Sequence, residues 1–199
     1  MKKDVNMNNI LIDCGGNLGQ GFRELESILG INDTWKVIIF EPNPHCIQQL
    51  KHNIKGLDYI EIVNKAVATN NNLATLFIPN NSNVSQGATI DGVKFLEDSV
   101  RQTIGGYGEN FEVECINLSE YISKLDGESI IHLKMDIEGG EYAILEHMIF
   151  EKTLSRVTKL YVEFHNRFVD DDKRKEFDER RDNILLHIKN TDIQFTEWH

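Results

Sequence analysis

Short apolar segments alternate along this chain with segments whose apolar residues recur at helical spacing. Four of the apolar segments end in an acidic residue: Ile10–Ile12 before Asp13, Val37–Phe40 before Glu41, Ile130–Met135 before Asp136 and Leu160–Val162 before Glu163. Continuous apolar runs of this length are typical of strands buried on both faces of a parallel sheet. The pattern predicts an α/β fold with an open, mostly parallel sheet and helices on both faces.

The residues between these runs indicate where the helices and further strands lie. Phe22, Leu25 and Leu29 recur at helical spacing after a glycine-rich turn, and Pro44 suits the first turn of the next helix. A β-rich stretch from Tyr59 to Val67 predicts a third strand. The other expected elements are strands over 73–78, 111–116 and 193–198, a short helix over 118–125 and a helix over 173–189.

The length of 199 residues allows one domain with a substantial core, and we expect a single domain over residues 1–199. Hydrophobic residues make up 40% of the chain and charged residues 27%, which excludes a disordered or collagen-like chain. Residues 79–110 are polar and rich in glycine near their end. We expect them to form a mobile lid or substrate loop.

The charge balance disfavours nucleic acid as a partner. The 32 acidic and 21 basic residues give a formal net charge of −11, which repels a phosphate backbone. No apolar run approaches the 18 or more residues of a membrane span, and the first residues are polar, unlike a signal sequence. The sequence therefore predicts a cytoplasmic protein. Its three cysteines, Cys14, Cys46 and Cys115, fit ordinary reduced thiols.

The carboxyl ends of the expected strands carry the main functional signal. In an open parallel sheet, ligands bind beyond these ends, so Asp13, Glu41, Asp136 and Glu163 are expected to meet at one rim. The glycines of segment 13–19 allow the backbone to turn sharply and to approach a ligand. Glu41, at the end of the second strand, is suited to accept both hydroxyls of a ribose.

The spacing of the glycines separates two classes of cofactor. A nicotinamide dinucleotide site requires G-x-G-x-x-G directly after the strand, and Gly15, Gly16, Gly19 and Gly21 do not give that spacing. Asp13 would also repel a pyrophosphate, whereas it suits a ligand with an ammonium group. The pattern D-x-G-x-x-x-G therefore favours S-adenosylmethionine.

Four motifs follow one another along the chain: Asp13–Gly19 (DCGGNLG), Phe40–Pro44 (FEPNP), Asn64–Val67 (NKAV) and Leu133–Glu141 (LKMDIEGGE). Together they resemble the ordered motifs of FkbM-type S-adenosylmethionine-dependent methyltransferases. The resemblance extends over about residues 10–165. Its most specific part is the pattern K-x-D-x-E-G-x-E within the last motif.

The resemblance implies a class I methyltransferase fold, which is a Rossmann-like open sheet, and usually O-methylation of a hydroxyl on a sugar, glycan, lipid-linked or natural-product acceptor. In that family the first motif lines the methionine end of the cofactor, Glu41 holds the ribose, and Asp136 with Glu138 lies where sulfonium and acceptor meet. The cofactor-binding residues implied are Asp13, Gly15, Gly16, Asn17, Gly19, Glu41, Pro42, Lys65, Ala66, Asp136 and Glu138, of which Lys65 and Ala66 lie near adenine.

Two departures from the family pattern bear on the fold. Family members commonly carry Asp where this chain has Ser119, which alters the anchoring of a loop. The family fold normally ends in an antiparallel hairpin, whereas this sequence stops at His199, just after the expected penultimate strand. We therefore expect a shortened C-terminal hairpin and an exposed sheet edge, which a second copy in a homodimer would cover.

Methyl transfer from a sulfonium is an in-line displacement, so the protein must align donor and acceptor and remove the acceptor's proton. The base could be His165, Glu163, Asp136 or Glu138, and His165 has the ordinary pKa nearest neutrality. We expect the catalytic residues among His165, Asp136 and Glu163. A metal site formed by Asp136, Glu163, His165 and Asp170 is an alternative, but this spacing matches no strong ligand motif, so no metal is expected.

Two functions from different classes remain open. The first is an active methyltransferase that acts on a small-molecule or glycan hydroxyl. The second is an adenosyl-ligand-binding protein without catalytic activity that serves as a structural or regulatory partner. The intact segment Lys134–Glu141 favours the first, whereas Ser119 and the shortened C-terminus leave room for the second.

Overall fold

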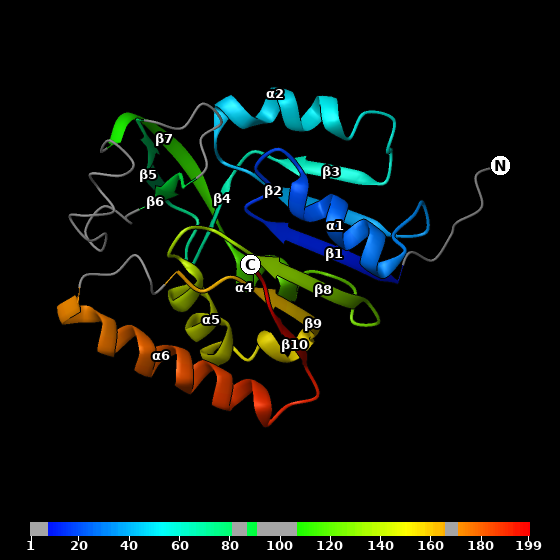
Figure 1. The fold of residues 1–199 in the computed structure, drawn as a ribbon. Coiled ribbons are helices and arrows are strands. Elements are labelled where there is room, and N and C mark those ends of the chain that lie inside the picture. The colour runs from blue at the N-terminus through cyan, green and yellow to red at the C-terminus, as the bar shows by residue number, and fades with distance from the viewer. Residues whose placement is uncertain (1–7, 81–86, 91–106, 166–170) are drawn as a thin grey trace.

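The computed structural model describes residues 8–80, 87–90, 107–165 and 171–199, and a six-stranded sheet forms its centre (Figure 1). The strands are β1 (Asn9–Cys14), β2 (Lys36–Phe40), β3 (Ile60–Val63), β8 (Ile130–Met135), β9 (Val157–Val162) and β10 (Gln194–Glu197). Their order is β3-β2-β1-β8-β9-β10, and every neighbouring pair is parallel. Counted along the chain, this is the order 3-2-1-4-5-6 of the Rossmann fold. The α/β class expected from the sequence is confirmed.

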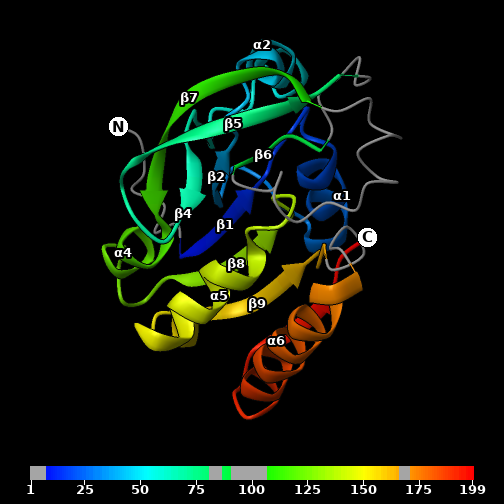
Figure 2. The ribbon, with the colours of Figure 1, turned by 90° about the vertical axis from the view of Figure 1, so that its left-hand side faces the viewer.

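Helices cover both faces of this sheet, as the two perpendicular views show (Figures 1 and 2). One face carries α1 (Gln20–Leu29) and α2 (Pro44–Asn53), and the other carries α4 (Leu118–Ser123), α5 (Glu141–Phe150) and α6 (Asp171–Lys189). A short 3-10 helix, Leu154–Arg156, precedes β9. The strands alternate between the two cores: Leu11 packs with Phe22 and Leu25 of α1, while Ile12 packs in the cluster that contains Leu145 of α5.

A second sheet is inserted between β3 and β8. Its strands are β4 (Ala66–Ala68), β5 (Leu73–Pro79), β6 (Thr89–Ile90) and β7 (Tyr107–Asn117), in the order β4-β7-β5-β6. The single strand expected over Tyr59–Val67 is therefore wrong, because the chain turns after Val63 and Ala66 joins the other sheet. The turn is held by Asn64, whose side-chain amide donates to the carbonyl of Glu41 at 2.8 Å.

The segment 79–110, expected to be a lid or substrate loop, contains regular structure. Thr89–Ile90 forms β6 against β5, and residues 107–110 belong to β7, which begins before the strand expected at Phe111. The expectation of a loop is wrong for these residues, since backbone pairing with β5 holds them. Residues 81–86 and 91–106 of that segment lie outside the described residues.

The strand β10 forms one edge of the six-stranded sheet and runs parallel to β9. Among the described strands, β9 is the one that pairs with it. Trp198, directly after β10, is buried against Tyr161 of β9 with ring centroids 5.9 Å apart. β10 is thus fixed to the core on the side of β9, and no other described strand pairs with its second edge.

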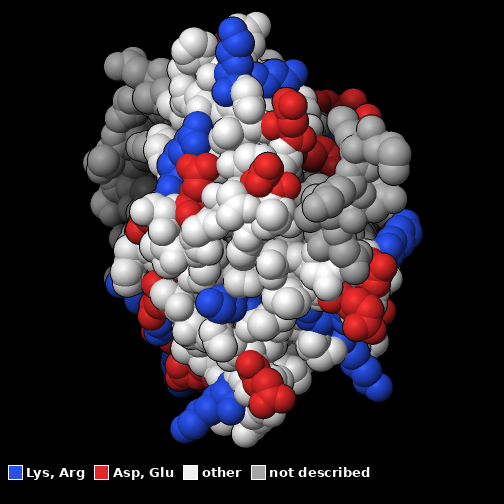
Figure 3. Space-filling model, turned by 90° about the vertical axis from the view of Figure 1, so that its right-hand side faces the viewer, with Lys and Arg blue, Asp and Glu red and all other residues white. Residues whose placement is uncertain are grey.

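The surface carries charges of both signs, and the three cysteines are buried and reduced. Figure 3 shows one face on which basic and acidic side chains are interspersed, with no continuous basic area. Among the described helices, none combines the length and the apolar character that crossing a membrane requires. Cys14, Cys46 and Cys115 are buried and form no disulfide.

The burial pattern of α1 predicts how substitutions change stability. Leu25 is fully buried between α1 and the sheet, so Leu25→Ala should lower the free energy of unfolding by about 3 kcal/mol. Ile28 lies on the same helix but is 60% exposed, and Ile28→Ala should change it by less than about 0.5 kcal/mol. Urea denaturation followed by circular dichroism measures both values, and equal effects would contradict this packing.

Candidate active site

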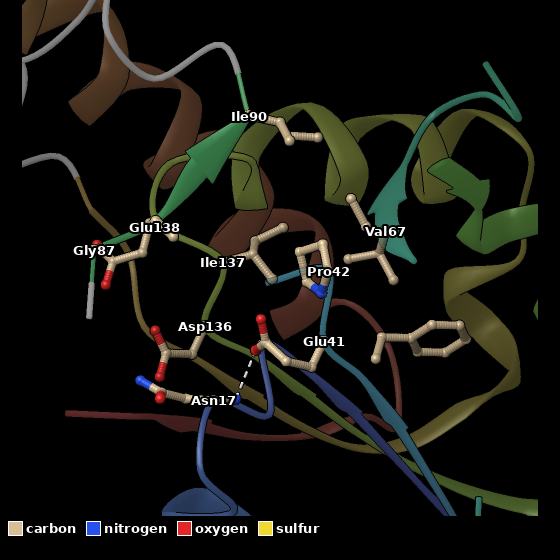
Figure 4. A pocket seen from close by; sticks show the side chains of 13 residues that line it. Asn17, Glu41, Pro42, Val67, Gly87, Ile90, Asp136, Ile137 and Glu138 are labelled. Carbon is tan, nitrogen blue, oxygen red and sulfur yellow. Dashed lines mark hydrogen bonds between the residues drawn. The ribbon is translucent and has the colours of Figure 1, made fainter. Parts of the chain in front are cut away.

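A cavity opens where the carboxyl ends of β1, β2 and β8 meet, at the rim that the sequence predicts (Figure 4). This is the point where the strand order reverses, because β1 has β2 on one side and β8 on the other. The side chains of Asn17, Glu41 and Asp136 lie together in one part of the cavity (Figure 4). Apolar side chains line the other part: Pro42, Val67, Ile90 and Ile137.

The loop after β1 forms one wall of this cavity and needs glycine at Gly15. Its φ of +84° is strained for other residues, and a Cβ there would lie 1.8 Å from the carbonyl oxygen of Asp136. The backbone amides of Gly15 and Gly16 both donate to the carbonyl of Phe40 at 3.0 Å. The loop is thereby tied to the end of β2, and it packs closely against the end of β8.

Two backbone amides hold the carboxylate of Glu41. The N–H of Asn17 donates to Oε2 and the N–H of Asn43 donates to Oε1, both at 2.7 Å. Burial raises the pKa of Glu41 to about 7, although these two hydrogen bonds favour the ionised form. Each carboxylate oxygen can accept a further hydrogen bond, so a diol could bind to a carboxylate whose position is already fixed.

Asp13 does not line the cavity. It is fully buried on the α1 side of the sheet, and its Oδ1 accepts a hydrogen bond from the Lys134 ammonium at 3.0 Å. The same ammonium donates to the carbonyl of Gly15 at 3.3 Å and lies 3.5 Å from Oδ2 of Asp136. Burial opposes the charge of Lys134, but Asp13 and Asp136 outweigh it and raise its pKa, so it stays an ammonium.

The turn after β8 forms the opposite wall and is held by Glu141, the first residue of α5. Its buried carboxylate accepts hydrogen bonds from the N–H of Ile137 at 2.9 Å and of Gly139 at 3.0 Å. Glu138, between them, has the left-handed φ of +58°. The hydroxyl of Thr89 in β6 donates to the carbonyl of Glu138 at 2.8 Å and joins the second sheet to this turn.

Four carboxylates surround the imidazole of His165. Nδ1 lies 2.8 Å from Oε1 of Glu141, and Nε2 lies 3.3 Å from Oε2 of Glu138, 3.7 Å from Oε1 of Glu163 and 3.8 Å from Oδ1 of Asp136. Burial opposes a charge on the ring, but the carboxylates of Glu141, Glu138 and Asp136 outweigh it and raise the pKa of His165 to about 9. A ring that is already protonated at neutral pH is poorly suited to act as a base.

The structure brings together most of the residues selected from the sequence. Those that line the cavity are Gly15, Asn17, Glu41, Pro42, Ala66, Asp136 and Glu138. His165 lies next to Glu138, and Glu163 lies next to His165, but neither of these two residues lines the cavity. Asp13, Gly16, Gly19 and Lys65 do not line it. Asp170, considered as a metal ligand, lies outside the described residues.

The residues outside the cavity have other contacts that explain their positions. A Cβ on Gly16 would lie 2.1 Å from Ile39, so this glycine packs against β2. Gly19 is the N-cap of α1. Lys65 pairs with Glu114 of β7 at 2.6 Å, and its side chain is 40% exposed.

Residues that sequence reasoning missed support the walls. Lys134 and Glu141 belong to the fourth motif but are not among the expected site residues. The signal that could have found Lys134 is its place inside a buried apolar strand, where a lysine requires a buried partner. Thr89 carried no signal in its local sequence. Ser119, the departure from the family pattern, is buried at the start of α4, with its Oγ 3.1 Å from Nδ1 of His147, and accepts a hydrogen bond from Thr153 at 3.0 Å. It therefore still anchors its loop, to α5 and the segment after it.

The buried ion pair predicts a specific stability pattern. Lys134→Met should lower the free energy of unfolding by about 3–5 kcal/mol, because Asp13 is left as an uncompensated buried charge. The double variant Lys134→Met/Asp13→Asn should recover part of that loss. Lys124→Met, which breaks an exposed pair with Glu120, is the control and should cost less than about 1 kcal/mol. Urea denaturation measures all three, and a Lys134→Met variant as stable as the control would refute the pairing.

Comparisons with known proteins identify the family of this chain. The model of the methyltransferase FkbM domain matches residues 13–190. Among solved structures, the chain is similar to methyltransferase FkbM from Methylobacillus flagellatus KT, with 16% sequence identity and a TM-score of 0.46, over 90% of this chain and 37% of that chain. The chain thus spans 37% of the length of that protein, and no curated protein matches it at a significant level. Because the family model covers most of the sequence, the chain belongs to the methyltransferase FkbM domain family.

Proposed function

We propose that this chain transfers the methyl group of S-adenosylmethionine to a hydroxyl oxygen of a sugar, a glycan or another small acceptor. The observation that carries the proposal is the acidic cavity at the switch point of the sheet, with Glu41 fixed by two backbone amides. Membership of the FkbM methyltransferase family supports methyl transfer as the reaction class. The cofactor, the acceptor and the roles of individual residues are proposals.

The charge of the cavity suits this cofactor. Its described lining contains Glu41, Asp136 and Glu138 and no lysine or arginine. S-adenosylmethionine carries an ammonium and a sulfonium against one carboxylate, so its net charge is complementary, whereas the pyrophosphate of a nicotinamide dinucleotide would be repelled. The cavity volume is about 90 Å³, so a ligand of this size would extend into the open mouth.

The two parts of the cavity suit the two ends of the cofactor. We propose that the ribose hydroxyls donate to Glu41, and that adenine lies against Pro42, Ala66 and Val67. Asn17 and the Gly15 loop, with Asp136, are then available for the methionine end. Asp13 supports this end indirectly, since Lys134 joins it to the carbonyl of Gly15.

Proton removal falls to the carboxylates near His165. When bound, the cofactor supplies an electrophilic methyl group, so the protein must orient the acceptor hydroxyl and accept its proton. Burial raises the pKa of Glu138, which brings this carboxylate closer to the range of an effective base. We propose that Glu138, with Asp136 or Glu163, takes the proton and that His165 holds these side chains in place.

A binding protein without catalytic activity is the alternative. It would retain the adenosyl site and lack methyl transfer to any of a panel of hydroxylated acceptors.

The open edge of β10 is the place where we propose that a second copy pairs.

The fixed carboxylate gives a direct test of the cofactor site. Glu41→Gln should weaken binding of S-adenosylhomocysteine at least about tenfold, because an amide has one oxygen acceptor where the carboxylate has two. Glu61→Gln, an exposed position in the neighbouring strand β3, is the matched control and should bind like the parent. Isothermal titration measures both, and parental affinity in Glu41→Gln would refute the assignment.

The pKa of Glu41 predicts how binding depends on pH. Hydroxyls that donate to a carboxylate favour its ionised form, and the pKa of Glu41 is raised to about 7. Affinity for S-adenosylhomocysteine should therefore be highest above pH 7. Below pH 7 it should decrease with falling pH, with a limiting slope of about tenfold per pH unit. Glu41→Gln should lack this dependence. Titrations between pH 5.5 and about 8 measure it, and an unchanged affinity in the parent would contradict the role of the ionised form.

A further inference from the structure

We propose that Asp136, Glu138, Glu163 and His165 bind a divalent transition-metal ion such as Mn²⁺ at the wall between the cavity and β9. Potential ligand atoms of Asp136, Glu138 and His165 all lie within 4.8 Å of one another. They come from two elements far apart in the sequence, the turn after β8 and the end of β9. Side chains of these types, gathered from separate segments, form the usual donor set of such a site.

The spacing of the donor atoms fits one shared ion. Nε2 of His165 lies 3.3 Å from Oε2 of Glu138, 3.7 Å from Oε1 of Glu163 and 3.8 Å from Oδ1 of Asp136. Two ligand atoms that each lie about 2.1 Å from one metal ion are about 3.0 Å apart at a right angle and about 3.4 Å apart at the tetrahedral angle. The separation from Glu138 falls within this range, and those from Glu163 and Asp136 exceed the tetrahedral value by a few tenths of an ångström. Small side-chain movements would close the site.

The orientation of His165 is the one that metal-binding histidines adopt. Its Nδ1 is hydrogen-bonded to Oε1 of Glu141 at 2.8 Å, which directs Nε2 toward the other three carboxylates. Glu141 is itself fully buried and is fixed by the amides of Ile137 and Gly139. In metal sites, a ligating imidazole almost always donates its other N–H to a carboxylate or carbonyl in this way.

The charge of the region also favours a cation. Asp13, Asp136, Glu138, Glu141 and Glu163 lie within one connected group, and its described contacts include two cationic groups, Lys134 and, when protonated, His165. Side-chain exposure is 0% for Glu141, 13% for Glu163 and 3% for His165, so water screens these charges poorly. A metal ion on Nε2 would take the place of a proton and would neutralise more of this charge.

The donor set selects the class of ion. Three carboxylates and one imidazole suit Mn²⁺, Fe²⁺ or Zn²⁺, because an imidazole ligand is less favourable for Ca²⁺ and Mg²⁺. The use of the ion rests on the proposed function: held by Glu138 and its neighbours, it would bind the acceptor hydroxyl and lower its pKa, and a carboxylate oxygen that does not contact the ion would take the proton. Binding of the ion itself does not depend on methyl transfer.

The test is binding of Mn²⁺ to chelator-treated protein, followed by the loss of the free-ion electron paramagnetic resonance signal. The parent should bind one ion per chain saturably, and Glu138→Gln and Glu163→Gln should each bind at least about tenfold more weakly. Glu114→Gln removes an exposed carboxylate elsewhere and should bind like the parent. Glu138→Gln and Glu163→Gln remove a charge and keep the size of the side chain. The test therefore does not depend on whether a variant of the buried His165 folds.

Absence of saturable binding in the parent, or equal affinity in Glu138→Gln, Glu163→Gln and Glu114→Gln, would overturn the proposal. Titration of the same samples with S-adenosylhomocysteine separates this outcome from a failure of the proposed function. Metal binding without adenosyl binding would support the metal site and refute the cofactor. Adenosyl binding without metal binding would refute the metal site and support the cofactor.

Discussion

The ammonium of Lys134 joins the two walls of the cavity. It binds Asp13 in β1, the carbonyl of Gly15 in the following loop and Asp136 at the end of β8. A charge inside a fully buried strand is costly unless it is paired, so these contacts fix the relative position of the two strand ends. The chain leaves room for the lysine at Gly21, where a Cβ would lie 2.6 Å from its Cε. The geometry of the site therefore depends on a group that does not line the cavity.

The other carboxylates are fixed in the same manner, by partners behind the cavity. Glu41 is held by the amides of Asn17 and Asn43, and Glu138 lies in a turn that Glu141 holds. Fixed carboxylates need not reorganise when a cation or a diol binds, so they can bind such ligands at little entropic cost. This arrangement gives the K-x-D-x-E-G-x-E pattern a physical meaning: its lysine and its last glutamate support the walls, and Asp136 and Glu138 line the cavity.

Much of the sheet could be predicted because each buried parallel strand is a continuous apolar run ending at the same rim. The position of Asp13 could not be predicted from strand order alone. Alternation along β1 places Asp13 on the same face as Leu11, which packs against α1. The β1–β8 register then sets Asp13 opposite Lys134. The break of the expected third strand after Val63 depends on pairing between Ala66 and Cys115, which lie far apart in the sequence. The raised pKa of His165 depends on Glu141, Glu138 and Asp136, which only the folded chain brings beside it, so it could not be predicted from the ordinary value of a histidine.

The central claim is that the acidic cavity at the ends of β1, β2 and β8 binds an adenosyl cofactor rather than a dinucleotide. Isothermal titration of the purified chain with S-adenosylmethionine and, separately, with NAD tests it most directly. The account predicts saturable binding of S-adenosylmethionine at one site per chain and no binding of NAD. Binding of NAD alone, or of neither ligand by a folded sample, would contradict it.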